Sequence, residues 1–131
     1  MFDIYVIESD ALIVCRPKGI LDAKMTQGIV EFIEIKELET ETGFNRFSDL
    51  TYLEGIHLSS ADVLRLATRR REFNPNGIRV KSGFLATDPL VAGIAHMYEQ
   101  LLDSPRIEVR VFGDMQSAAE WLGVKVDSLK F

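Results

Sequence analysis

Cysteine and histidine, the side chains most often used for metal binding and nucleophilic chemistry, are scarce in this chain. Cys15 is the only cysteine, so no disulfide can form within the chain, and it lies in an apolar run that predicts a buried thiol. The only histidines, His57 and His96, cannot by themselves build a Cys/His metal cluster. The sequence also lacks the GxGxxG, Walker A and HExxH patterns. We therefore expect no metal and no nucleotide cofactor.

Long apolar runs and an excess of basic residues are also missing. No run approaches the length of a membrane span, and the N-terminal segment lacks the basic start and small-residue cleavage site of a signal peptide. The net charge of -5 opposes nonspecific binding to nucleic acid and to anionic lipid. A lone cysteine fits a reducing compartment. Together these features predict a cytoplasmic protein without a nucleic-acid partner.

The patterns that are present predict an α/β fold. With 131 residues, of which 47% are hydrophobic, the chain is expected to form one domain over residues 1–131. The first helix should begin at Asp22, with Glu31, Glu34 and Lys36 turned to water, and residues 55–58 should form a loop. Expected strands cover residues 2–7, 11–16, 47–53, 78–86 and 106–112, and the later helices begin near residues 60, 88 and 114. The order ββαβαβαβα predicts a mixed, mostly parallel five-stranded sheet with about four helices.

Two segments of the chain resemble a known family. Asp49–Leu53, the loop to Ser60 and the helix after it are similar to the SpoIIAA-like, or STAS, fold of anti-sigma-factor antagonists. Arg106–Phe112, followed by Ala118–Leu122, resembles the STAS/SEC14-related branch of unknown function. The resemblance implies a non-enzymatic regulatory domain that binds a protein partner. The SEC14-related branch implies an alternative, a module that binds a small apolar molecule or a lipid.

His57, Ser59, Ser60 and Asp62 form the candidate switch or partner-binding site. In the antagonists that this chain resembles, a partner kinase phosphorylates a serine at the start of this helix, and Ser59 or Ser60 has the comparable place. A phosphate there would meet unpaired backbone N–H groups and the positive end of the helix dipole. The alternative is structural, a capping box between Ser59 and Asp62. Because triads are assembled from separate parts of a fold, the short spacing of these residues gives no support for catalysis.

Four arginines concentrate positive charge on the second expected helix, at positions Arg65, Arg69, Arg70 and Arg71. One interpretation is a solvated helix end whose charges oppose the dipole. The other is a patch that binds an anion or an acidic partner, because guanidinium groups bind carboxylate and phosphate bidentately.

Large apolar side chains at Phe32, Phe84, Ile94 and Tyr98 are candidates for the lining of an apolar pocket. The alternative is that they fill a closed core. A pocket of ligand size would distinguish the two interpretations.

Self-association is expected from two parts of the C-terminal region. The strand over residues 106–112 alternates, with one face apolar and the other charged through Arg106, Glu108 and Arg110. We predict an edge strand and a homodimer, which is the commonest oligomer. An apolar tail follows, which either joins the interface or packs on its own domain: Val124, Val126, Leu129 and Phe131.

Overall fold

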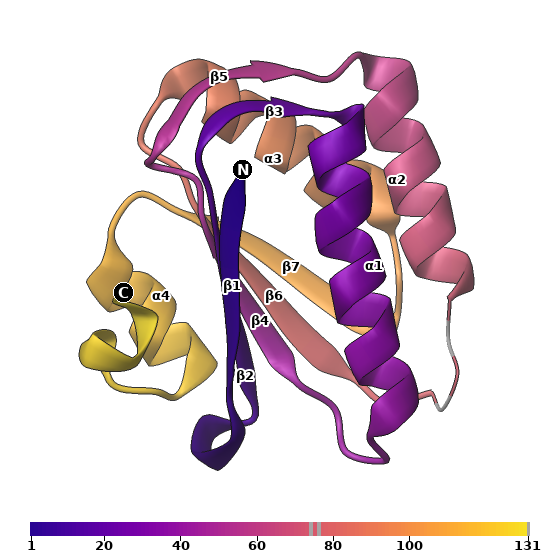
Figure 1. The fold of residues 1–131 in the computed structure, drawn as a ribbon, viewed down its shortest axis with the longest axis vertical. Coiled ribbons are helices and arrows are strands. Elements are labelled where there is room, and N and C mark those ends of the chain that lie inside the picture. Colours follow the sequence, from indigo (N-terminus) through magenta and orange to yellow (C-terminus); the bar gives the residue numbers. More distant parts are fainter. Residues whose placement is uncertain (74, 76, 131) are drawn as a thin grey trace.

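The central element of the structure is a sheet in the order β1-β2-β4-β6-β7 (Figure 1). The computed structural model describes every residue except 74, 76 and 131. The first two strands pair antiparallel and the others are parallel, so the predicted mixed, mostly parallel five-stranded sheet is confirmed, with the last strand at an edge. The strands are β1 (Phe2–Ile7), β2 (Leu12–Pro17), β4 (Asn45–Asp49), β6 (Val80–Leu85) and β7 (Ile107–Phe112).

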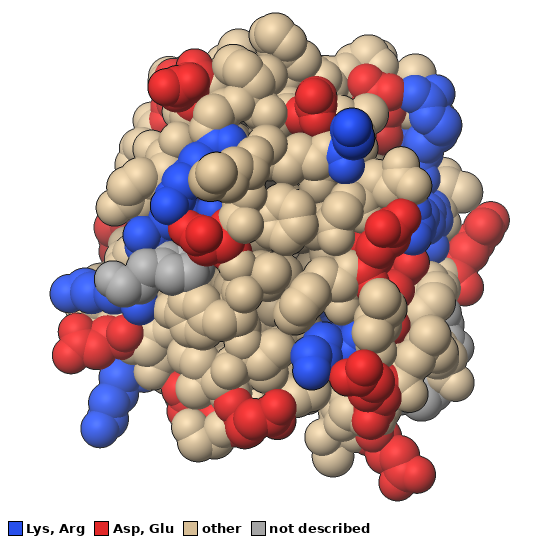
Figure 2. Space-filling model, in the orientation of Figure 1, with Lys and Arg blue, Asp and Glu red and all other residues tan. Residues whose placement is uncertain are grey.

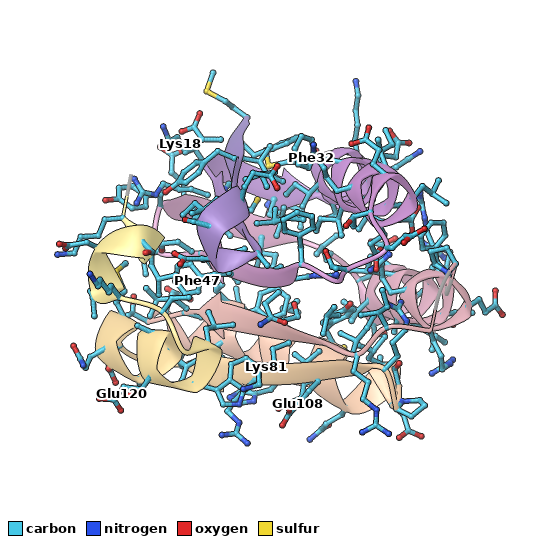
Figure 3. The ribbon with its side chains drawn as sticks, turned by 90° about the horizontal axis from the view of Figure 1, so that it is seen from below. Lys18, Phe32, Phe47, Lys81, Glu108 and Glu120 are labelled. Carbon is cyan, nitrogen blue, oxygen red and sulfur yellow. The ribbon has the colours of Figure 1, made fainter. Side chains whose placement is uncertain are left out.

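Four α-helices cover the two faces of this sheet (Figures 1 and 3). The helices α1 (Ala23–Glu39), α2 (Ser60–Glu72) and α3 (Pro89–Leu102) lie on one face. The other face is covered by α4 (Met115–Leu122) and the short 3-10 helix η2 (Val126–Leu129). None of the described helices is long and apolar enough to cross a membrane.

Each α-helix begins at a polar side chain that accepts a hydrogen bond from a backbone N–H of the first turn, as the sequence predicted. Asp22 accepts from Met25 N, and Asp114 accepts from Ser117 N. Asp88 accepts from the backbone N–H groups of Leu90 and Val91, and Pro89 follows at the first helical position. These caps explain why the helix starts were readable from sequence: they depend on residues close together in the chain.

Two further strands, β3 (Gly19–Asp22) and β5 (Leu53–His57), form a separate parallel pair. The pair arches over one end of the main sheet and leads into the N-termini of α1 and α2 (Figure 1). The prediction of a loop over residues 55–58 was therefore wrong for residues 55–57, and the preceding strand ends at Asp49 rather than at residue 53. Each short strand is stabilised by a partner distant in sequence, which local patterns do not reveal.

The strand β2 is buried on both faces because it lies between helical layers. Leu12 and Val14 contact the α4 side together with Phe47, which is labelled in Figure 3, whereas Ile13 packs under α1. The α4 side also takes in Val124, Val126 and Leu129, so the described part of the apolar tail packs on its own domain. The remaining tail residue, Phe131, lies outside the described residues.

We expect Asp88→Ala to lower the free energy of unfolding by about 1 kcal/mol, because two backbone N–H groups at the start of α3 lose their acceptor. Asp88→Asn, which keeps an accepting oxygen, should stay close to wild type. Urea denaturation followed by circular dichroism measures both variants. Equal losses of unfolding free energy in the two variants would show that the missing helix cap does not cause the destabilisation.

Candidate functional site

A cavity of about 110 Å³ lies between the main sheet and the helices α1, α2 and α3. Its floor is formed by β2, β4 and β6, and residues of β3 and β5 line it as well. Most of the wall is aliphatic, and the lining includes Leu21, Val30, Ile56, Val63, Val91 and Ile94. An engineered apolar cavity of roughly 150 Å³ binds benzene, so this space is of a size that accepts a small ring or a short chain.

Polar side chains occupy one part of the cavity floor. Along β4, Arg46 and Ser48 face the cavity while Phe47, between them, faces the α4 side. The backbone register places Arg46 beside Ser82 of β6 and Ser48 beside Phe84. The cavity therefore has a polar floor section set against aliphatic walls, the usual composition of a small-molecule site.

Behind this polar section lies a buried ion cluster centred on Glu37 of α1. Oε2 of Glu37 accepts from Nη1 of Arg106 at 3.0 Å and lies 3.4 Å from Nη2 of Arg46. Oε1 accepts from Nη2 of Arg70 at 2.8 Å. All four residues are buried. One carboxylate thus joins α1 to β4, to α2 and to the residue that precedes β7.

Glu34, one helical turn before Glu37, makes the second link between α1 and α2. It accepts three hydrogen bonds from Arg69, the shortest 2.7 Å, and one from Arg70 at 3.2 Å. The expectation that Glu34 faces water was wrong, because α2 places two guanidinium groups against that face of α1. Glu37 and Arg46 were not among the predicted site residues. The i,i+3 spacing of Glu34 and Glu37, which places both on one face of α1, was the available signal that they share a contact.

The charges of this cluster stabilise one another. Burial on its own would raise the pKa of Glu37, but the positive charges of Arg46 and Arg70, with hydrogen bonds from Arg70 and Arg106, hold that pKa below its ordinary value. Burial, and after it the charge of Arg70, lower the pKa of Arg46 to about 10 against the opposing effect of Glu37. Glu37 and Arg46 are therefore both charged at neutral pH.

The helices α1 and α2 are held together at both ends, with the cavity between them. Their N-termini follow β3 and β5, which pair with each other, and the ion pairs of Glu34 and Glu37 join their C-terminal halves (Figure 1). Residues from the middle of both helices, including Val30 and Leu66, line the cavity. The residues that line the cavity thus lie between the two links that join α1 to α2.

No family model and no curated protein matches the chain. Among solved structures, it is similar to an uncharacterised protein of the DUF3478 family with a SpoIIAA-like fold from Shewanella loihica PV-4. The two chains share 18% sequence identity and superpose with a TM-score of 0.60, over 93% of this chain and 92% of the other. The chain has a SpoIIAA-like fold. The likeness carries no function with it, so function has to be argued from the site.

The predicted switch residues lie at the start of α2 in this SpoIIAA-like fold. The backbone N–H of Ser59 donates to Oδ2 of Asp62 at 2.9 Å, and the N–H of Asp62 donates to Oγ of Ser59 at 3.1 Å. This reciprocal pair is the capping box that was weighed as the structural alternative. Ser60 is exposed at the first helical position, and His57 is exposed at the end of β5. Of the two serines, Ser60 is thus the one whose hydroxyl is free of the capping box.

The four arginines of α2 do not lie on one open surface. Arg70 is buried in the ion cluster, and Arg69 binds Glu34. Arg71 donates to the carbonyl oxygens of Leu101 and Leu102 at 2.9 Å each, and Arg65 pairs with Asp62 in its own helix. Figure 2 shows acidic and basic side chains next to each other over α1 and α2. An anion that bound all four arginines would have to displace these partners.

Three of the four predicted pocket residues line the cavity, namely Phe84, Ile94 and Tyr98. The rings of Phe84 and Tyr98 meet edge to face, with their centroids 5.8 Å apart. Phe32 is the exception. It packs with the cluster around Ile13, on the side of α1 that meets the first two strands (Figure 3), and it does not line the cavity, whereas its neighbour Ile33 does.

We expect Glu37→Gln to lower the free energy of unfolding at neutral pH by about 3 kcal/mol or more, because it leaves buried guanidinium groups without a counter-charge. Since folding depresses the pKa of Glu37, its ionised form stabilises the fold above the ordinary glutamate pKa. The difference between wild type and variant should therefore shrink as the pH falls below about 4.3.

Urea denaturation across a pH series measures this difference. Glu39→Gln, at an exposed position on the same helix, is the matched control and should cost about 1 kcal/mol or less. A Glu37 variant as stable as the Glu39 variant would contradict the structural role of the cluster.

Cys15 should react slowly in the folded protein. Its side chain lines the cavity and is 2% exposed, and burial, with the negative charge of Asp3, raises the thiol pKa to about 12. The thiolate that attacks alkylating reagents is therefore rare at pH 8. Mass spectrometry after iodoacetamide treatment should show an unmodified native protein and complete labelling in urea. Rapid native labelling would mean that the cavity opens easily.

Proposed function

We propose that this protein binds a small molecule with an apolar body in the cavity between the main sheet and α1, α2 and α3. The observation that carries the proposal is the cavity itself, with aliphatic walls and a polar floor section. A few polar groups among apolar side chains are the usual composition of a small-molecule site, in which the polar groups orient the ligand.

The size of the cavity limits the size of the ligand. A ligand that fills a space of about 110 Å³ would contact the apolar wall on several sides, and its apolar part should be about the size of a benzene ring or a chain of about six carbons.

Hexan-1-ol is a suitable first probe because it has an apolar chain and no charge. We expect it to raise the melting temperature of the wild-type protein in a concentration-dependent way, since a ligand that binds only the folded state stabilises it. Ala95→Leu, which places a larger side chain at a lining position, should reduce the shift. Differential scanning calorimetry measures both.

Gly93→Leu is the matched control for this experiment. Gly93 is on the same helix, and a Cβ placed there meets nothing within 4 Å, so the added side chain points into open space. The control should keep the wild-type response. If hexan-1-ol shifts none of the three proteins, or shifts Ala95→Leu as strongly as wild type, the cavity is not a binding site.

A regulatory protein-interaction function is the second candidate, and the exposure of Ser60 at the start of α2 favours it. A phosphate on Ser60 would lie at the positive end of the helix dipole without breaking the capping box. We expect Ser60→Asp to lose a partner that wild type and Ser60→Ala both retain in a pull-down from the protein's own cells. Retention of every partner by Ser60→Asp would remove the switch model.

The predicted homodimer also stays a proposal. The edges of the main sheet are β1 and β7, and an edge strand is where a second copy could pair. Light scattering coupled to size exclusion gives the mass directly, and a mass of 14.8 kDa would identify a monomer.

A further inference from the structure

Arg46, at the polar section of the cavity, has hydrogen-bond donors that no group of the described residues uses. Among the described residues, its hydrogen bonds go from Nη2 to Oε2 of Glu37 and to the carbonyl oxygen of Phe44 at 3.2 Å. Its Nε is buried and has no partner. The side chain is 5% exposed. A buried guanidinium with unused donors is costly, and an anion is the acceptor that would compensate it best.

The charge balance of the buried cluster also favours the binding of an anion. The buried side chains are Arg46, Arg70 and Arg106 against Glu34 and Glu37, which leaves one positive charge in excess. Arg69 adds a further, partly exposed positive charge to Glu34. Because buried charges are stable only when paired, the cluster as it stands lacks one negative charge.

Hydroxyl groups accompany Arg46 on the cavity wall. Ser82 lies beside Arg46 in the register of β4 and β6, and Tyr98 reaches the cavity from α3. No described group forms a hydrogen bond with either hydroxyl. Together with the guanidinium, they supply donors from the sheet and from a helix at one part of an apolar cavity.

We propose that the ligand of this cavity carries a carboxylate and that Arg46 binds it. The inference rests on the proposed function of the cavity. A monocarboxylate supplies the one missing negative charge, its planar oxygens match a guanidinium, and its apolar body lies against the aliphatic walls. The ligand class is therefore a small monocarboxylic acid with an apolar body of about six carbons.

The test compares hexanoate, hexan-1-ol and hexylamine, which each contain six carbons in an unbranched chain and differ in the end group, a carboxylate, a hydroxyl or an ammonium. Isothermal titration calorimetry at neutral pH should show hexanoate binding about tenfold or more tightly than hexan-1-ol, because charge-assisted hydrogen bonds are stronger than neutral ones. Hexylamine should bind more weakly than either, since it adds positive charge to a positive cluster.

Two variants separate recognition from stability. Arg46→Met should remove the preference for hexanoate, so that the ratio of the hexanoate affinity to the hexan-1-ol affinity falls from about tenfold to about one. Arg106→Met is the matched control, because Arg106 is as buried, binds the same carboxylate of Glu37 and does not line the cavity. It removes one positive charge from the cluster but no contact with the cavity, so it should keep most of the preference for hexanoate. An equal loss of that preference in both variants would overturn a direct contact with Arg46.

A measurement on the wild-type protein keeps the test valid if these variants do not fold. In a nitrogen-15 NMR spectrum of the arginine Nε–H groups, hexanoate should move the Arg46 signal, assigned in the wild-type protein by through-bond correlation to its backbone, and hexan-1-ol should not. Equal affinity for hexanoate and hexan-1-ol, with an unmoved Arg46 signal, would overturn the carboxylate inference while the cavity remains a binding site. No binding of either probe would overturn both proposals.

Discussion

The carboxylate of Glu37 is the contact on which the arrangement of this protein depends most. It binds guanidinium groups from β4, from α2 and from the start of β7, and so joins four separate parts of the chain at one buried point. Such a cluster adds less stability than well-packed apolar residues would, because each charge has to leave water. Its value is specificity, since any shift of α1 or α2 would leave buried charges unpaired.

The cavity lies between two links that join α1 to α2. Pairing of β3 with β5 positions the N-termini of α1 and α2, and the ion pairs with Glu34 and Glu37 position their C-terminal halves. The apolar side chains that line the cavity lie between these two links. The cluster around Glu37 also places an incompletely neutralised guanidinium at the polar section of the cavity.

The SpoIIAA-like fold is compatible with more than one function, so the argument rests on the site. The family resemblance suggested a phosphorylated serine at the start of α2. This segment contains a complete capping box, in which the Ser59 side chain accepts a hydrogen bond from the backbone N–H of Asp62. The arginines of α2, which suggested an anion patch, are used mainly in contacts to α1 and α3. A hydrogen-bond donor without a partner among the described residues lies instead on Arg46, in the cavity.

The sequence by itself determined the features that depend on neighbours in the chain. Helix starts at Asp22, Ser59 and Asp88, the alternation of β7 and the order of the five main strands all follow from local caps and periodicity, and they were predicted correctly. Three pocket residues were also recognised, because large apolar side chains on inward faces are visible in the pattern.

Only the tertiary structure decided which charges became buried. Glu34, expected in water, and Arg106, expected on an exposed strand face, lie in the cluster because their counter-charges come from distant elements. The pairing of β3 with β5 and the position of Phe32 outside the cavity lining have the same origin. A sequence pattern states that a residue is charged or apolar, but the free energy of burying it depends on what the fold brings against it.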